Sequence, residues 1–183
     1  MCSNWGHGAA GFGGTKSNGE GWQLYLNGMG IKGFRQDVFD NMRECEVIYM
    51  QDNEITNLPD GLFNSLSSLK YIQLSNNKLA TLPETIFRGQ STHVLAAPTL
   101  RWVYLNNNEL VSLPQTIFQG LVDEQSYLRG LWQLHLQDNG LTCVPLSPYE
   151  ISKLSTFNGP RDTCEASFVL TCLRALSFRS LVL

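Results

Sequence analysis

Apolar residues recur along this chain in short alternating stretches that are separated by polar turns. The stretches "YIQLS" from residue 71 and "WVYLN" from residue 102 alternate in period two, as expected of a short strand with one buried face. Each runs into an Asn-containing segment, such as "YLNNNEL" at residues 104–110. Asn is a poor strand and helix former and favours turns. The pattern therefore predicts a series of short strands, each of which ends in a turn.

This arrangement of apolar and polar positions repeats at least four times. Each copy has an Asn anchor with apolar residues three and five positions before it and two and five positions after it. A proline follows six positions after the anchor, and an aromatic residue follows ten positions after it. So many aligned columns indicate internal repeats. The anchors are Asn53, Asn77, Asn108 and Asn139; the aromatic column is Phe63, Phe87, Phe118 and Tyr149; a weaker first copy has Leu24, Leu26, Ile31, Phe34 and Phe39, with Met29 at the Asn position.

Residues 69–79, "LKYIQLSNNKL", fit the signature L-x-x-L-x-L-x-x-N/C-x-L at every fixed position. The chain thus resembles the leucine-rich repeat family over about residues 21–154, and "TLPETIF" is similar to the continuation seen in the variety of roughly 24 residues that is common in receptor ectodomains. The resemblance implies an α/β solenoid: a curved right-handed horseshoe segment with short parallel strands on its concave side and an irregular or 3-10 convex side. Stacked repeats bury the apolar face that one repeat alone would expose.

Repeats start near residues 21, 45, 69, 100 and 131, so the steps between them are 24, 24, 31 and 31 residues. Both long steps insert residues after the Phe, at "QSTHVLAAPT" and "VDEQSYLRG". These insertions are either added contact loops or segments without a function, which are poorly ordered or arise from a faulty gene model. The expected organisation is a flexible Gly-rich segment at 1–20, the repeat domain at 21–154, and a C-terminal cap or tail at 155–183.

The Asn column is expected to hold the scaffold together. An Asn side chain donates and accepts, so stacked Asn residues can satisfy turn backbone groups that neighbouring strands leave unpaired. Replacing Asn108 with alanine should then lower stability by roughly 1–3 kcal/mol. Extracellular members of the family often end in a disulfide-stapled cap, and this implies Cys143–Cys164 as the expected pair. Connectivity cannot be deduced from sequence, and in a reducing compartment all five cysteines would be thiols. Cys45, in the first repeat column, is expected to be buried.

Composition excludes several functions. The formal net charge is -3, and no cluster of Lys and Arg is present, which argues against nucleic acid as a partner. The segment "GHGAAGFGGTKS" fails as a P-loop because Thr15 separates Gly14 from Lys16. His7, His93 and His135 show no metal-ligand or triad spacing. No catalytic site, metal or cofactor is therefore expected, and the chain is not expected to be an enzyme.

The variable strand positions are expected to point out of the concave face. Tyr and Trp dominate interface hot spots, and Asn, Gln and Asp can pair with peptide groups or sugar hydroxyls. The alternative is that these aromatic side chains only pack across strands. Asn108 is assigned to the scaffold, whereas Asn106 and Asn107 are assigned to the binding surface. The candidate ligand-binding residues are Tyr25, Tyr49, Asp52, Tyr71, Asn76, Trp102, Tyr104, Asn106, Asn107, His135 and Asp138.

The expected function is a non-catalytic recognition module that binds a protein or peptide ligand. Two alternatives stay open: the sensing part of a larger receptor or signalling enzyme, whose kinase or GTPase part lies outside this chain, and a carbohydrate-binding module with a glycan partner. The sequence shows no secretory signal, no N-x-S/T sequon and no evident membrane span. The resemblance favours an extracellular or cell-surface location, and a cytoplasmic one stays open.

Overall fold

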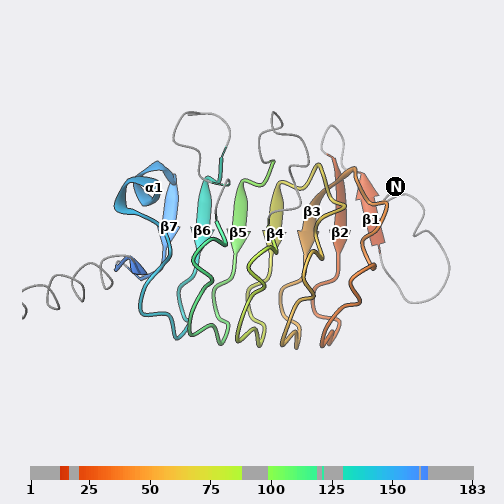
Figure 1. Cartoon of the computed structure of the whole chain (residues 1–183). Coiled ribbons are helices and arrows are strands. Elements are labelled where there is room, and N and C mark those ends of the chain that lie inside the picture. The colour runs from red at the N-terminus through yellow and green to blue at the C-terminus, as the bar shows by residue number, and fades with distance from the viewer. Residues whose placement is uncertain are drawn as a thin grey trace, which may run out of the picture.

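A computed structural model of the chain describes residues 13–16, 21–87, 99–118, 121, 130–160 and 162–164, with backbone alone for 13–16. Seven strands lie side by side in one sheet, in the order of the sequence (Figure 1). The elements are β1 (Gly13–Lys16), β2 (Trp22–Tyr25), β3 (Cys45–Tyr49), β4 (Tyr71–Gln73), β5 (Trp102–Tyr104), β6 (Gln133–His135), α1 (Pro148–Lys153) and β7 (Thr156–Asn158).

Strands β2 to β7 are parallel, and only β1 is antiparallel to its neighbour. The register pairs Ile48 with Ile72, Ile72 with Val103, and Val103 with Leu134, so the repeat columns read from the sequence coincide with columns of the sheet. Steps of 24 and 31 residues give the same register. The extra residues of the long steps therefore lie between strands, and most of them fall outside the described residues.

The core lies between the sheet and the opposite, convex side of each repeat. Ile48 of β3 and the central residue of each strand from β4 to β6 are fully buried, because alternate side chains of a strand point to opposite faces. Phe rings from the convex side meet them: Phe39 stacks on Phe63 at 6.2 Å between ring centroids, and Phe87 stacks on Phe118 at 6.3 Å. One apolar core thus runs through successive repeats, as stacking requires.

The convex side consists of turns that follow each Leu-Pro step. The N–H of Leu62 donates to the carbonyl of Pro59 at 3.3 Å, and Ile86 and Ile117 repeat this contact with Pro83 and Pro114. These are bonds between residues three apart, as in a 3-10 turn. In the described parts of the chain no 3-10 helix is formed there. Proline begins each turn because its ring fixes φ and removes a ladder donor.

Tyr149 does not fill the interior as the aromatic column predicted. It lies in α1 and is 49% exposed. Ser147 and Glu150 form a capping box, in which the Ser147 hydroxyl accepts from the Glu150 N–H and the Glu150 carboxylate accepts from the Ser147 N–H. The box starts a helix where earlier repeats have a turn. Leu146 and Leu154, on either side of the helix, are buried instead.

Both ends of the sheet extend beyond the expected repeat domain. The segment expected as a Gly-rich lead-in contains β1, and the segment expected as a cap contains β7, which pairs with β6.

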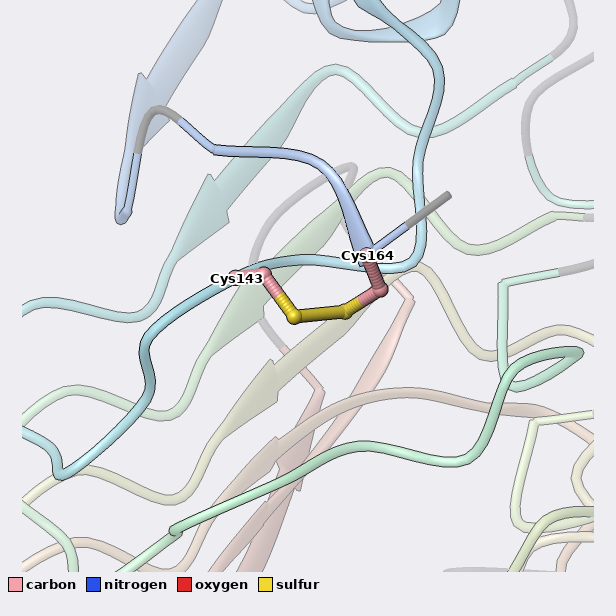
Figure 2. Close-up of a disulfide and its surroundings, with 2 residues drawn as sticks. All are labelled: Cys143 and Cys164. Carbon is pink, nitrogen blue, oxygen red and sulfur yellow. A yellow bond between two sulfur atoms is a disulfide. The ribbon is translucent and has the colours of Figure 1, made fainter. Parts of the chain in front are cut away.

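Cys143 and Cys164 are joined by a disulfide with a Cα–Cα distance of 5.1 Å (Figure 2). In the first repeat, an apolar pocket of about 500 Å³ is lined by Leu24, Leu26, Ile31, Phe34, Phe39 and Met42. No helix in the described ranges is long and apolar enough to cross a bilayer.

Candidate functional site

The anchor asparagines tie each repeat to the one before it. The Asn77 Oδ1 accepts from the N–H of Ile55 at 3.0 Å, and its Nδ2 donates to the carbonyls of Met50 at 2.9 Å and Leu74 at 3.0 Å. Two of these three groups belong to the preceding repeat. The same contacts recur at Asn53, Asn108 and Asn139. These side chains face inward and are not available to a ligand.

Burial along this Asn ladder falls at its C-terminal end. Asn53, Asn77 and Asn108 are 7–8% exposed, whereas Asn139 is only partly buried. When such an Asn side chain is replaced, the backbone groups that it had bonded can bond to water instead if water reaches them. The loss of stability is then smaller than at a buried position. The ladder members therefore share a geometry but are expected to differ in their contribution to stability.

The residue before each anchor Asn has a left-handed backbone. The φ angles are 60° at Asp52, 55° at Asn76, 54° at Asn107 and 57° at Asp138, and Gly28 takes the position in the first repeat with φ 65°. Asn, Asp and Gly tolerate this conformation better than other residues. The sequence placed the four Asp and Asn residues on the ligand face; the structure gives them a role in the turn as well.

Side chains in this left-handed column also bond to one another. Asn76 Nδ2 donates to Asp52 Oδ1 at 2.7 Å, and Asn107 Nδ2 donates to Asn76 Oδ1 at 2.8 Å. All three are exposed. Asn106, beside them, is half-buried, and its carbonyl accepts from the N–H of Asn76 at 3.1 Å. The sequence assigned both Asn106 and Asn107 to binding. Asn107 also needs a residue that tolerates a left-handed backbone, whereas Asn106 does not.

An unbroken series of ring contacts runs along the concave face from β2 to β6. Ring centroids are 4.9 Å apart between Tyr25 and Tyr49, 5.4 Å between Tyr49 and Tyr71, 5.2 Å between Tyr71 and Tyr104, and 4.5 Å between Tyr104 and His135. We call these five residues the aromatic ladder. Contacts of this length stabilise aromatic pairs beyond the area they bury.

Tyr71 bridges a gap in the aromatic ladder. By register Gln73, and not Tyr71, is the partner of Tyr49 and of Tyr104. Tyr71 comes from the adjacent column, yet its ring contacts both neighbours. Burial, together with the nearby Tyr104 and Tyr49, raises the pKa of Tyr71 to about 12. Tyr71 therefore keeps its proton at a pH at which an ordinary tyrosine, with a pKa near 10, would lose it.

Glutamines fix the tyrosine hydroxyls on this face. Tyr25 donates to Gln23 Oε1 at 2.6 Å, and Tyr104 donates to Gln133 Oε1 at 2.9 Å. These bonds hold the Tyr25 and Tyr104 rings in place. A surface that is already ordered loses less conformational entropy on binding.

Trp132 is a residue of this surface that the sequence did not single out. It is 40% exposed and lies edge-on to Trp102, with ring centroids 5.4 Å apart and planes at 80°. The guanidinium carbon of Arg101 lies 5.8 Å from its ring centroid. The sequence did hold a sign that Trp132 is exposed. It occupies the second position of its repeat, where the three preceding repeats have a charged residue: Glu46, Lys70 and Arg101.

The concave face carries almost no charge. The outward residues of β2 to β6 include none of Asp, Glu, Lys or Arg. At the start of the strands, Lys70 Nζ pairs with Glu46 Oε2 at 2.8 Å. No group of three or more His, Cys, Asp or Glu in the described ranges could hold a metal ion. The expectations of no catalysis and no cofactor stay predictions.

Acidification should destabilise the fold through His135. Burial lowers the pKa of its imidazole from the ordinary 6.5, and its Nδ1 lies 3.0 Å from Asn158 Nδ2. The unfolded chain therefore binds a proton at a higher pH than the folded chain, so stability falls as the pH drops below about 6.5. Urea midpoints at pH 7.5 and 5.5 should differ more for the natural protein than for His135→Gln. Equal differences would show that His135 does not contribute.

Comparison with known proteins decides the family. A sequence profile described as "Leucine rich repeat" matches residues 23–79 and 44–91, which hold β2, β3 and β4. The chain is a leucine-rich repeat protein. Among solved structures, it is similar to a chain of the Drosophila structure titled "Structure of the Toll - Spatzle complex, a molecular hub in Drosophila development and innate immunity".

This similarity concerns the fold alone. The TM-score is 0.52 at 22% sequence identity, over 76% of this leucine-rich repeat chain. The match covers 20% of the other chain, so this protein spans about a fifth of the length of that relative. A comparison with curated protein sequences found no significant match.

Proposed function

We propose that this leucine-rich repeat protein is a non-catalytic module that binds a protein or peptide ligand through the concave face of β2 to β6. The aromatic ladder carries the proposal: five rings in contact from Tyr25 to His135, on strands without charged outward residues. Tyr and Trp supply large contact area at low entropic cost. The Toll–Spatzle similarity supports a protein partner as the chemistry to test first.

Cross-strand packing alone would not require rings that water can reach. Tyr25, at one end of the aromatic ladder, is 37% exposed, and Trp132, beside Trp102, is 40% exposed, so part of this aromatic surface is open to solvent. A protein partner also fits better than a glycan. In the Tyr25–Tyr49 and Tyr104–His135 pairs the ring planes are within 14° of parallel, so each ring covers one face of its neighbour, and sugars would need those faces for stacking.

Tyr49→Ala and Trp102→Ala should each weaken the complex at least about tenfold, a loss of about 1.4 kcal/mol in binding free energy. The partner would be captured by pull-down, identified by mass spectrometry, and its Kd measured by calorimetry. Tyr149→Ala is the matched control, because Tyr149 is an exposed aromatic residue of α1, away from the concave face. Natural affinity in both concave-face variants, with melting temperatures unchanged, would remove the assignment.

Two broader features of the function stay proposals. The protein is either free-standing or the sensing part of a larger receptor or signalling enzyme, and full-length transcripts that encode a membrane span or a catalytic domain would decide for the latter. Disulfides persist in oxidising compartments, so the Cys143–Cys164 bond supports an extracellular or cell-surface location. Counting of thiols in native protein tests the location. A glycan array, with Trp102→Ala as control, tests the carbohydrate alternative.

A further inference from the structure

We propose that the apolar pocket of the first repeat is a binding site for a small uncharged apolar molecule. The inference goes beyond the proposed function, because this pocket lies on the core side of the sheet. Leu24 and Leu26 are buried and line the pocket, whereas Tyr25 between them is exposed and belongs to the aromatic ladder. Three features carry the inference: the volume of the pocket, its position at the end of the solenoid, and the chemistry of its wall.

The pocket is a space within the apolar core. Its volume is about 500 Å³, within the range of pockets that bind small molecules, roughly 300–1,000 Å³. Voids larger than a water molecule are few in protein interiors. Phe39 lines the pocket and stacks on Phe63 of the second repeat, so the ring that covers it comes from one side of the array. The side chains of the first repeat thus leave room that the described residues do not fill.

The sheet cannot close this space by adding another repeat. A repeat joins a solenoid by contact with its neighbour, which here means pairing with a strand edge. β1 occupies one edge of β2, with Gly13 opposite Tyr25, and β3 occupies the other, so β2 has no free edge (Figure 1). Ile31, Phe34 and Val38 line the pocket and are only half-buried, so solvent reaches the pocket beside them. A small molecule can enter by this route.

Backbone groups of the wall already have hydrogen-bond partners. The Ile31 N–H donates to Asn53 Oδ1 at 3.1 Å, and the Ile31 carbonyl accepts from the Glu54 N–H at 2.9 Å. The Leu26 carbonyl accepts from Asn53 Nδ2 at 2.8 Å. In the part of the chain that the structure describes, the shielded side-chain atoms without a partner lie outside this pocket, in Gln51, His135 and Gln137. An apolar ligand therefore leaves no group of this wall unpaired.

The two charged residues that line the pocket neutralise each other. Arg35 Nη2 lies 2.9 Å from Asp37 Oδ2, and both side chains are exposed. The other lining residues are uncharged. A charged group that entered the pocket would lose its water without gaining a partner, which is costly, whereas apolar surface gains from leaving water. The wall therefore favours an uncharged ligand.

The test titrates the full chain with N-phenyl-1-naphthylamine, an uncharged probe whose fluorescence rises in apolar surroundings. We expect saturable binding at one site per chain. The anionic relative 8-anilinonaphthalene-1-sulfonate should bind at least tenfold more weakly. Ile31→Trp places a larger side chain in the wall and should weaken binding of the uncharged probe at least tenfold.

Met29→Trp is the matched control and should bind the uncharged probe as the natural protein does. Met29 and Ile31 both donate their N–H to Asn53 Oδ1, at 2.9 and 3.1 Å, so they belong to the same turn. The Met29 side chain, however, is 44% exposed and does not line the pocket.

Hydrogen exchange on the natural protein is a second measurement, so a folding defect in a variant cannot decide the result. A ligand that binds the folded state makes its opening rarer. The probe should slow exchange of the Leu26 N–H, which donates to the Tyr49 carbonyl at 2.7 Å, more than that of the Leu105 N–H, which donates to the His135 carbonyl at 2.9 Å.

The inference would be overturned by the absence of saturable binding, by binding that survives Ile31→Trp, or by equal affinity for the anionic probe. Two other occupants would also overturn it. If the uncharged probe binds only after residues 1–12 are removed, that segment fills the pocket. If sedimentation shows a dimer that the probe dissociates, a second copy of the chain fills it.

Discussion

Asn108→Ala should lower the free energy of unfolding by about 3 kcal/mol, the upper end of the cost of a buried polar group left without a partner. Asn108 is 8% exposed. Its Oδ1 accepts from the N–H of Leu79 at 3.1 Å, and its Nδ2 donates to the carbonyls of Leu74 at 3.0 Å and Leu105 at 3.1 Å. Alanine satisfies none of these groups, and the space is too enclosed for water to replace the amide freely. Urea unfolding measures the change.

Two neighbouring asparagines serve as controls. Asn106→Ala removes a half-buried side chain outside the Asn ladder, and Asn139→Ala removes the least buried ladder member. Both should cost less than Asn108→Ala, with Asn106→Ala the least of the three, because water reaches each site. Equal melting temperatures for the Asn106 and Asn108 variants would refute the division of "NNN" into a scaffold residue and surface residues.

Removal of the Cys143–Cys164 disulfide should cost about 3 kcal/mol, the value expected for a closed loop of this length. The two cysteines are 21 residues apart, and the loop contains α1 and β7. The bond limits the unfolded chain, so its loss raises the entropy of unfolding. The double variant Cys143→Ala, Cys164→Ala should show the loss in urea unfolding.

A reductant provides the control for the disulfide. It should destabilise the natural protein by a similar amount and leave the double variant unchanged. The loss should also be concentrated in the last repeat and its neighbour, because each repeat of a solenoid contacts only the repeats next to it. A natural protein that is indifferent to reductant would show that the bond does not contribute to stability in solution.

The fold was predictable because each repeat column has one physical task. An Asn followed by Leu at fixed spacing can satisfy the same turn only if the strands are in register, and the observed pairs Ile48–Ile72 and Ile72–Val103 follow those columns. The prediction that Tyr149 fills the interior was wrong because the capping box at Ser147 starts a local helix, which the repeat pattern does not contain. β7 was missed because "TFN" has neither the Asn anchor nor the Leu-Pro step.

For the concave face, the sequence predicts which residues point outward but not which of their rings are in contact. Period two places Tyr49 and Trp102 on the outward side of their strands, as the structure does. No rule of sequence says that Tyr71 should reach from its own column to contact the rings on both sides of Gln73. The left-handed backbone of Asp52, Asn76, Asn107 and Asp138 was likewise hidden, because the same residue types are expected at a binding surface and at a strained turn.

The two ends of the solenoid are closed in different ways. At the C-terminal end, the disulfide spans α1 and β7, whereas the first repeat contains an apolar pocket of about 500 Å³ beneath β2. Local opening costs least where packing is loosest. Each repeat that opens then leaves its neighbour as the new end. We therefore expect unfolding to start at the first repeat, and the repeat closed by the Cys143–Cys164 disulfide to be lost last.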